Sequence, residues 1–241
     1  EKSDFFTFRR NQLRGADILL EEPSVTATEN VLMAACLADG KTMIFNAACE
    51  PHVTDLGNLL CSMGARIEGL GTNRIVVEGV DSLGGATHTI GPDHIEVGSM
   101  IAAVAATGGE LRVERAGSLD TLAVLEPAYR RLGLSWEVEE GSILVPGKQK
   151  LCVSHREGTS IPKIEDGPWP LFPSDLMSVL IVLATQVRGT VLFFEKMFES
   201  RMYFVDRLLD MGAQVIQCDP HRVVVAGPSR LQGTHLAGPD I

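Results

Sequence analysis

The stretch Phe172-Pro-Ser-Asp-Leu-Met-Ser-Val-Leu-Ile-Val-Leu-Ala184 joins a proline-rich segment directly to an apolar one. The three prolines between Pro168 and Pro173 exclude regular helix and central strand, so we expect an extended approach that turns into a helix. We expect Ser174 to be the N-cap of that helix, with Asp175 in its first turn beside N–H groups that favour negative charge. From this pattern alone, Asp175 is either a helix-capping acid or a functional carboxylate.

The apolar segment is repeated. Apolar helical runs lead to Gly40, Gly109 and Gly189, and each is followed by a predicted strand, a second helix and a second glycine. The second glycines are Gly64, Gly133 and Gly212, and the gap within each pair is 24, 24 and 23 residues. The strands predicted between the two helices are 42–46, 111–114 and 190–195. A gap this constant indicates duplicated supersecondary units of about 70 to 80 residues.

Each unit closes with a β-branched segment, and these predicted strands are 74–78, 142–146 and 222–226. The expected order is therefore strand, helix, strand, helix, strand, strand. The first helix of a unit has almost no polar face, as in 102–106 and 179–184, so we expect it to be surrounded, whereas the second helix is amphipathic. These features predict an α/β fold with apolar helices packed together and sheets outside. A solenoid is the alternative, although its repeats are usually shorter, about 20 to 45 residues.

Composition limits the function classes. The 241 residues are 45% hydrophobic, enough for a large core in one or two domains. A formal net charge of -10 argues against a nucleic acid or an anionic membrane as the main partner. The five cysteines form no CxxC pair, and no apolar run approaches about 18 residues. We expect a cytoplasmic protein with free thiols and no metal site.

Several short motifs occur in one order along the chain: Pro23–Thr28, Asn46–Pro51, Gly71–Ile75, Pro92–Gly98, Phe172–Asp175, Phe198–Arg201 and Gly238–Asp240. With these motifs and the repeat, the sequence resembles the UDP-N-acetylglucosamine 1-carboxyvinyltransferase family, the enolpyruvyl transferases of peptidoglycan synthesis. The resemblance extends from Leu13 to Ile241.

The resemblance implies two similar domains, each an inside-out α/β barrel of three βαβαββ units with its helices inside. Residues 1–92 would form the C-terminal part of the first domain, and residues 93–241 two units of the second, with a third truncated. Gly238–Asp240 repeats Gly91–Asp93, so a further unit should begin where the chain stops. We therefore expect a fragment that lacks both ends of its parent protein and is inactive by itself.

The resemblance also implies a reaction. The enolpyruvyl group of phosphoenolpyruvate would be transferred to the 3-hydroxyl of UDP-N-acetylglucosamine with release of phosphate, by addition and elimination through a tetrahedral intermediate. No metal or organic cofactor is implied, and the two small-molecule substrates are the expected partners. Two alternatives remain open at this point: a shikimate-pathway enolpyruvyl transferase, and a non-catalytic repeat protein that binds nucleotide sugars.

Three residues match catalytic positions of the family. Asp175 matches the aspartate that takes the proton of the sugar 3-hydroxyl, a role suited to a carboxylate at a helix start. Arg201 matches an arginine near the phosphoenolpyruvate end of the site, where a planar, permanently charged donor suits a carboxylate or phosphate. Asp240 matches a further active-site aspartate. The general acid of the family, a cysteine or aspartate in a loop, belongs to a part outside this chain.

The segment ahead of the apolar helix at Val31 matches the nucleotide-binding stretch. Free N–H groups at a helix start can bind pyrophosphate oxygens, and Ser24 can add a hydroxyl. Many relatives have lysine where Glu22 stands, so we expect backbone contacts there, and we expect Ser24–Thr26 to face Asp175 across the domain boundary. Met197 is either a substrate contact or ordinary core. The expected substrate-binding residues are Glu22, Pro23, Ser24, Val25, Thr26, Asp175 and Met197.

Overall fold

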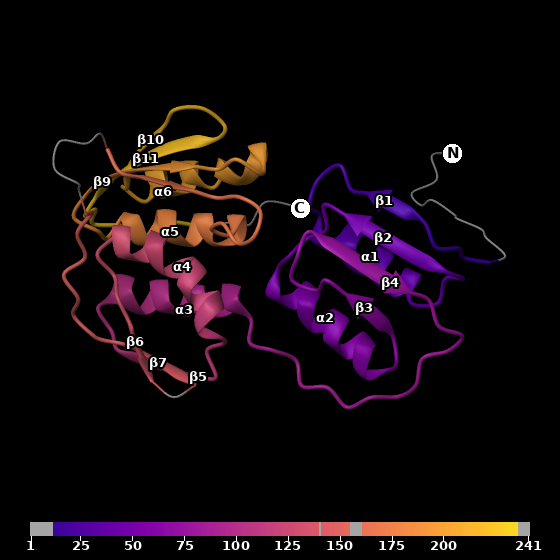
Figure 1. Cartoon of the computed structure of the whole chain (residues 1–241). Helices are drawn as coiled ribbons and strands as arrows, with labels where there is room; N and C mark the ends of the chain where they lie inside the picture. Colours follow the sequence, from indigo (N-terminus) through magenta and orange to yellow (C-terminus); the bar gives the residue numbers. More distant parts are fainter. Residues whose placement is uncertain (1–11, 140, 155–160, 236–241) are drawn as a thin grey trace. The chain divides into compact units, whose positions relative to one another are not determined.

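A computed structural model describes residues 12–139, 141–154 and 161–235 of the chain. The chain separates into two compact units, one ending at Gly91 and the other beginning at Pro92. The first unit holds one copy of the repeat and the second unit holds two (Figure 1).

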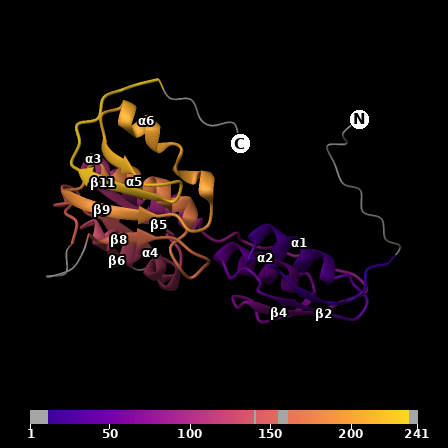
Figure 2. The same cartoon turned by 90° about the horizontal axis from the view of Figure 1, so that it is seen from above.

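The first unit has the full predicted order of elements. They are β1 (Asp17–Leu19), α1 (Val25–Ala35), β2 (Lys41–Phe45), α2 (Pro51–Ser62), β3 (Arg66–Glu68) and β4 (Arg74–Glu78). The sheet order is β1-β2-β4-β3, with β1 parallel to β2 and the other pairs antiparallel. Both helices cover the same face of the sheet (Figure 2). Leu32, Ile44 and Ile75, each fully buried, form the centre of this core.

The last repeat has the same topology. Its elements are β8 (Lys163–Glu165), the 3-10 turn η1 (Ser174–Leu176), α5 (Met177–Ala184), β9 (Gly189–Phe194), the 3-10 turn η2 (Glu199–Met202), α6 (Val205–Asp210), β10 (Gln214–Gln217) and β11 (Arg222–Gly227). The sheet order β8-β9-β11-β10 matches that of the first unit strand for strand, including the parallel first pair. The predicted repeat is therefore confirmed at the level of strand pairing.

The middle repeat is shorter than predicted. It contains α3 (His94–Thr107), β5 (Leu111–Glu114), α4 (Leu119–Arg131), β6 (Glu137–Glu139) and β7 (Ser142–Val145). Its sheet, β5-β7-β6, corresponds to the last three strands of the other two sheets. The expected first strand is absent: the described residues between β4 and α3 form no strand, and they include Gly91 and Pro92, which do not favour one.

The second glycine of each repeat has a conformational reason. Gly64, Gly133 and Gly212 all have positive φ values, of 105°, 78° and 93°, and each is the second residue after the last residue of the second helix. In each case the next residue donates its N–H to a carbonyl five residues back, for example Ala65 to Leu60 at 2.9 Å. This is the Schellman ending of a helix, which requires a left-handed residue that glycine adopts without steric penalty.

In the second unit, α3 and α5 pack against each other between the two sheets (Figure 1). Gly98 lets the helices approach, since a Cβ there would lie 2.7 Å from the Leu176 side chain. The buried Tyr129 hydroxyl of α4 donates to the Gly98 carbonyl at 2.8 Å. Sheets outside and apolar helices inside were predicted, but no closed barrel is present in the described residues.

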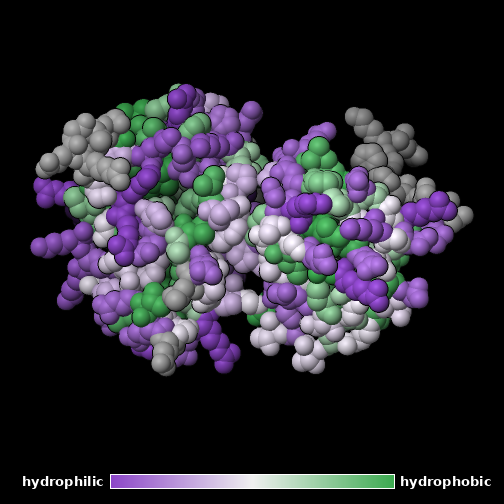
Figure 3. Space-filling view, in the orientation of Figure 1, coloured by the Kyte–Doolittle hydropathy of each residue, from purple (hydrophilic) through white to green (hydrophobic). Residues whose placement is uncertain are grey.

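The apolar pattern predicted that the first helix of each repeat is surrounded on all sides, and this prediction is wrong. Met33 of α1, Met100 of α3 and Val182 of α5 are each at least 40% exposed. Figure 3 shows one face of the molecule, on which apolar and polar residues are mixed. These helices therefore keep an apolar side without a partner in the described parts of the chain.

Among the residues that the structure describes, no helix is long and apolar enough to cross a membrane. All five cysteines are free thiols. Burial raises the pKa of Cys36 and of Cys49 above the ordinary value, as expected for thiols that pack as small apolar groups.

Candidate functional site

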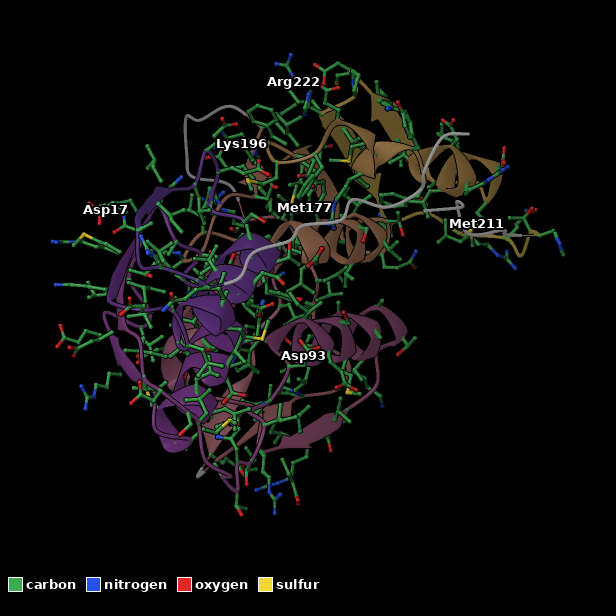
Figure 4. All side chains as sticks on the ribbon, turned by 90° about the vertical axis from the view of Figure 1, so that its right-hand side faces the viewer. Asp17, Asp93, Met177, Lys196, Met211 and Arg222 are labelled. Carbon is green, nitrogen blue, oxygen red and sulfur yellow. The ribbon has the colours of Figure 1, made fainter. Side chains whose placement is uncertain are left out.

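The start of α5 differs from the prediction at Ser174. Helix α5 begins at Met177 (Figure 4), after the 3-10 turn η1, and Ser174 is not its N-cap. The Ser174 hydroxyl instead donates to the carboxyl of Glu195 at 2.9 Å. An N-cap serine accepts from a backbone N–H, whereas this hydroxyl donates to a buried carboxyl group, so the serine links two segments rather than capping a helix.

Asp175 lies in η1 and forms an ion pair with Arg201 of η2. The Arg201 Nη1 to Asp175 Oδ1 distance is 2.5 Å, and the side chains are 39% and 59% exposed. The guanidinium carbon of Arg201 also lies 4.7 Å from the centre of the Phe198 ring, within cation–π range. Two of the predicted catalytic residues, 26 positions apart, are thus brought into contact by the adjacent loops.

Beneath these loops lie two buried carboxyl groups. Asp166 directly follows β8 and Glu195 directly follows β9, and both side chains are 0% exposed. The parallel pairing of these strands places their ends side by side, with Glu165 opposite Phe194. Side chains along a strand alternate between its two faces, so Asp166 lies on the same inward face as Ile164, and Glu195 on the same inward face as Phe193. The pleat therefore directs both carboxyl groups into the interior.

Three consecutive N–H groups bind this carboxyl pair. Lys196 N–H donates to Asp166 Oδ1 at 2.5 Å, and the N–H groups of Met197 and Phe198 donate to Glu195 Oε1 at 3.1 and 3.2 Å. Burial, together with the hydrogen bond and negative charge of Asp166, raises the pKa of Glu195 to about 7, against the opposing effect of Ser174 and the Met197 N–H. Met197 itself is half-buried, and its backbone takes part in this network.

Asp175 and Arg201 lie at one end of an open groove along α3 and α5 with a volume of about 1170 Å³. Apart from these residues, the groove is mostly apolar. Its lining includes Ala102, Ala103, Ala106, Val179, Val182, Leu183, Tyr203 and Phe204. The arrangement combines an acceptor for a proton, a fixed cation for an anion and an apolar wall, which is the usual composition of a small-molecule site.

The predicted nucleotide-binding residues lie in the first unit, at the start of α1. This helix begins at Val25, six residues before the predicted start, so Ser24 is its N-cap and accepts from Ala27 N–H at 3.3 Å. Glu22 and Thr26 are exposed, and Pro23, Ser24 and Val25 are half-buried. The first-turn N–H groups of such a helix lack partners within the helix and are available to an anion.

The remaining predicted site residue, Asp240, lies outside the described residues. In the described parts of the chain, no group of three or more histidine, cysteine or acidic residues could hold a metal ion. His94 is buried at the start of α3 against Trp169, with ring centres 5.1 Å apart, a position that supports a packing role.

Asp166 and Glu195 were not predicted as site residues. A signal for them was present, because Glu195 is the last residue of the predicted strand 190–195 and Asp166 directly follows the short strand β8, both at inward positions. An inward acid at the end of a strand is a rare event unless it has partners. Recognising the pair would have required the parallel pairing of β8 and β9, and no residue range was predicted for β8, which is three residues long.

Comparisons with known proteins identify the class to which this fold belongs. The chain matches the family described as EPSP synthase (3-phosphoshikimate 1-carboxyvinyltransferase) over residues 5–240. It belongs to this family. The crystal structure of the enolpyruvyl transferase NikO from Streptomyces tendae superimposes with a TM-score of 0.73 at 22% identity, over 91% of this chain and 53% of that one, which shows the shared fold.

Relatives of higher identity carry one name. UDP-N-acetylglucosamine 1-carboxyvinyltransferase of Bradyrhizobium diazoefficiens is 53% identical over 239 residues, which is 99% of this chain and 55% of the relative. The protein of the same name from Borreliella burgdorferi is 54% identical over 97% of this chain and 54% of the relative. The chain therefore spans about half the length of the relatives it matches.

Proposed function

We propose that this chain is part of an enzyme that transfers the enolpyruvyl group of phosphoenolpyruvate to the 3-hydroxyl of UDP-N-acetylglucosamine, in peptidoglycan synthesis. The observation that carries the proposal is the Asp175–Arg201 pair at the end of the groove, in a chain 53% identical to a UDP-N-acetylglucosamine 1-carboxyvinyltransferase. The structure supplies a proton acceptor and a permanent cation within one site, which a transfer to a hydroxyl from an anionic donor requires.

Each member of the pair has a distinct role in this proposal. Asp175 accepts the proton of the sugar hydroxyl as its oxygen attacks the enolpyruvyl carbon. Arg201 binds the carboxylate or phosphate of phosphoenolpyruvate, for which its planar donor group is suited. In the free protein Arg201 pairs with Asp175, so an incoming anion would replace that partner and release the carboxylate for its role as a base. Asp240 is proposed as a further active-site acid.

The start of α1 is proposed as the nucleotide side of the site. Its first-turn N–H groups and the Ser24 hydroxyl would receive diphosphate oxygens, with Pro23, Val25 and Thr26 around them. The exposed carboxylate of Glu22 disfavours an anion, so at this position the backbone supplies the contact. Met197 is proposed as an apolar contact to the substrate.

We propose the inside-out barrel as the complete architecture, with 1–92 in the first domain and 93–241 in the second. The exposed apolar sides of α1, α3 and α5 support this, because each would be covered by an equivalent helix of another unit. The groove along α3 and α5 is mostly apolar and would receive such a helix, leaving the part near Asp175 for substrate.

The proposal is tested with a full-length enzyme that contains this sequence. Phosphate release from phosphoenolpyruvate is measured with UDP-N-acetylglucosamine and, separately, with 3-phosphoshikimate as the acceptor. We expect release with the nucleotide sugar alone, and formation of its enolpyruvyl ether. Release with 3-phosphoshikimate alone would instead identify the shikimate-pathway enzyme. Binding of the nucleotide sugar without release in either case would identify a non-catalytic binding protein.

A further inference from the structure

The loops that carry Asp175 and Arg201 share one anchor. The loop between β8 and α5 is attached through the Ser174 hydroxyl, and the loop after β9 through the N–H groups of Lys196, Met197 and Phe198. All four donors end on the carboxyl groups of Asp166 and Glu195. The geometry of the proposed site therefore depends on the buried carboxyl groups of Asp166 and Glu195.

These four donors leave one oxygen of the pair unpaired, because Asp166 Oδ2 is buried without a donor in the described structure. Its neighbour is the carboxyl group of Glu195, at the end of the adjacent parallel strand, and both side chains are 0% exposed. Two buried carboxylates at adjacent strand ends cannot both be ionised without a large repulsive energy, and one proton between them removes it. That proton also supplies the missing donor.

We propose that Asp166 and Glu195 are positioning residues, which share one proton and thereby hold the Asp175 turn and the Arg201 turn together at the end of the groove. The pair then carries a single negative charge, which the three N–H groups and the serine hydroxyl stabilise. Loss of the shared proton places two charges side by side in the interior and separates the two loops. The roles of Asp175 and Arg201 rest on the proposed function, whereas the shared proton does not.

The first repeat shows that the fold does not require this pair. At the corresponding strand ends it has Leu20 and Asn46, and the Asn46 amide donates to the Leu20 carbonyl at 3.0 Å. A neutral pair therefore satisfies the same strand ends. The two acids of the last repeat are thus an addition to the scaffold, located where the proposed catalytic residues lie.

Other titratable groups surround the pair. The His221 ring Nδ1–H donates to the Glu195 carbonyl at 2.8 Å, from the turn before β11. The other charged groups near the strand ends include Lys163 and Lys196, which both pair with Glu165, the Asp175–Arg201 pair beside Ser174, and the Asp219–Arg222 pair beside His221. Histidine is the side chain that ordinarily changes charge between pH 5 and pH 8, so His221 needs its own control.

The sign of the pH effect follows from the proton balance. In the unfolded chain the two carboxyl groups titrate near their ordinary values, about 4 to 4.5. The folded protein keeps the shared proton up to the raised pKa of Glu195, about 7. Between these values the folded state binds more protons, so stability falls as pH rises from about 4.5 to about 7 and is level above that range.

The test uses the purified chain and the isosteric variant Glu195→Gln, whose amide can donate to Asp166 at every pH. Infrared spectra recorded as a function of pH should show a protonated carboxyl band in the wild type that disappears around pH 7, and the variant should lack it. The melting temperature of the variant minus that of the wild type should increase from pH 5 to pH 8. His221→Gln is the control and should keep both wild-type signals.

Two results would overturn the proposal: no protonated carboxyl band in the wild type at pH 6, or loss of the pH effect in His221→Gln with its retention in Glu195→Gln. In the full-length enzyme, Glu195→Gln should keep kcat within about threefold at pH 7 and Glu195→Ala should lose at least tenfold, whereas equal loss in both would contradict a positioning role. If the infrared titration succeeds and neither acceptor supports phosphate release, the shared proton stands and the proposed function fails.

Discussion

The first and last repeats have the same strand order but opposite arrangements at the start of their first helix. In the first repeat Ser24 accepts from Ala27 N–H and caps α1, which is 11 residues long. In the last repeat Ser174 donates to Glu195, and α5 has 8 residues after a 3-10 turn. A serine near the start of the first helix therefore caps the helix in one copy and fixes a loop in the other.

The difference originates in the strand ends. Leu20 and Asn46 are neutral, and Ser24 caps its helix. Asp166 and Glu195 instead accept hydrogen bonds from the Ser174 hydroxyl and from three backbone N–H groups. The last repeat also has more residues between its first strand and first helix, including the three prolines. A duplicated scaffold thus acquires a candidate site by changing a few residues where strands end, while the sheet pairing and core positions stay the same.

The largest expected effect concerns Asp175, which lies 14 residues before Gly189 where the first repeat has Thr26 before Gly40. In the full-length enzyme, Asp175→Asn should lower kcat by about 10² to 10⁴ with a smaller effect on UDP-N-acetylglucosamine affinity, because the amide cannot accept the proton. Steady-state kinetics with a thermal melt check this. Asp210→Asn, an exposed acid paired with Arg207 at 3.5 Å, is the matched control and should be near wild type. Near-normal kcat for Asp175→Asn would remove the catalytic assignment.

The sequence predicted the strands and the glycines well, because both follow from local chemistry. The closing strands of the first and last repeats begin at Arg74 and Arg222 as predicted, since β-branched alternation is a short-range signal. The helix start at Ser174 was predicted wrongly, because its hydroxyl partner is 21 positions away on another strand. The start of α1 was placed six residues late, since polar residues between Val25 and Asn30 hid an apolar face. The long-range partner of Ser174 decided the first of these two points, whereas the local Ser24 cap decided the second.

The second effect compares the strand-end residues directly. Glu195→Ala removes the acceptor of two N–H groups and leaves Asp166 without its proton partner, so we expect a loss of about 3 kcal/mol or more in the free energy of unfolding. Asn46→Ala removes one hydrogen bond at a residue with φ of 57°, and about 1 to 2 kcal/mol is expected. Urea denaturation of both variants measures the difference. Equal losses in the free energy of unfolding would contradict a larger stabilising role for the two acids.

The third effect concerns the glycines that end the second helices. It distinguishes the cost of a positive φ for alanine from the cost of steric contact of its Cβ. A Cβ at Gly133 would lie 2.6 Å from the Cys152 nitrogen, whereas at Gly64 nothing lies within 4 Å. Both have positive φ, so Gly64→Ala should cost about 1 kcal/mol and Gly133→Ala clearly more, because backbone atoms must also move. Denaturation midpoints give the order, and the reverse order would contradict the packing described here.

The smallest effect concerns the two serines. Ser24→Ala removes a helix cap and should cost about 1 kcal/mol at any pH. Ser174→Ala should leave α5 intact but raise the pKa of Glu195 further, because the hydroxyl that lowers it is lost. Melting temperatures from pH 5 to pH 8 distinguish the two variants. If both behave as simple caps, with parallel pH profiles, the two helix starts are equivalent after all.

The most direct test of the central claim gives the last repeat the strand-end residues of the first, in the double variant Asp166→Leu and Glu195→Asn. Melting temperature is measured from pH 4 to pH 8 in the purified chain, and kcat in the full-length enzyme. We predict a folded protein that has lost the fall in stability between about pH 4.5 and pH 7, and a full-length enzyme with kcat at least tenfold lower. A double variant with the wild-type pH profile and wild-type kcat would contradict the account.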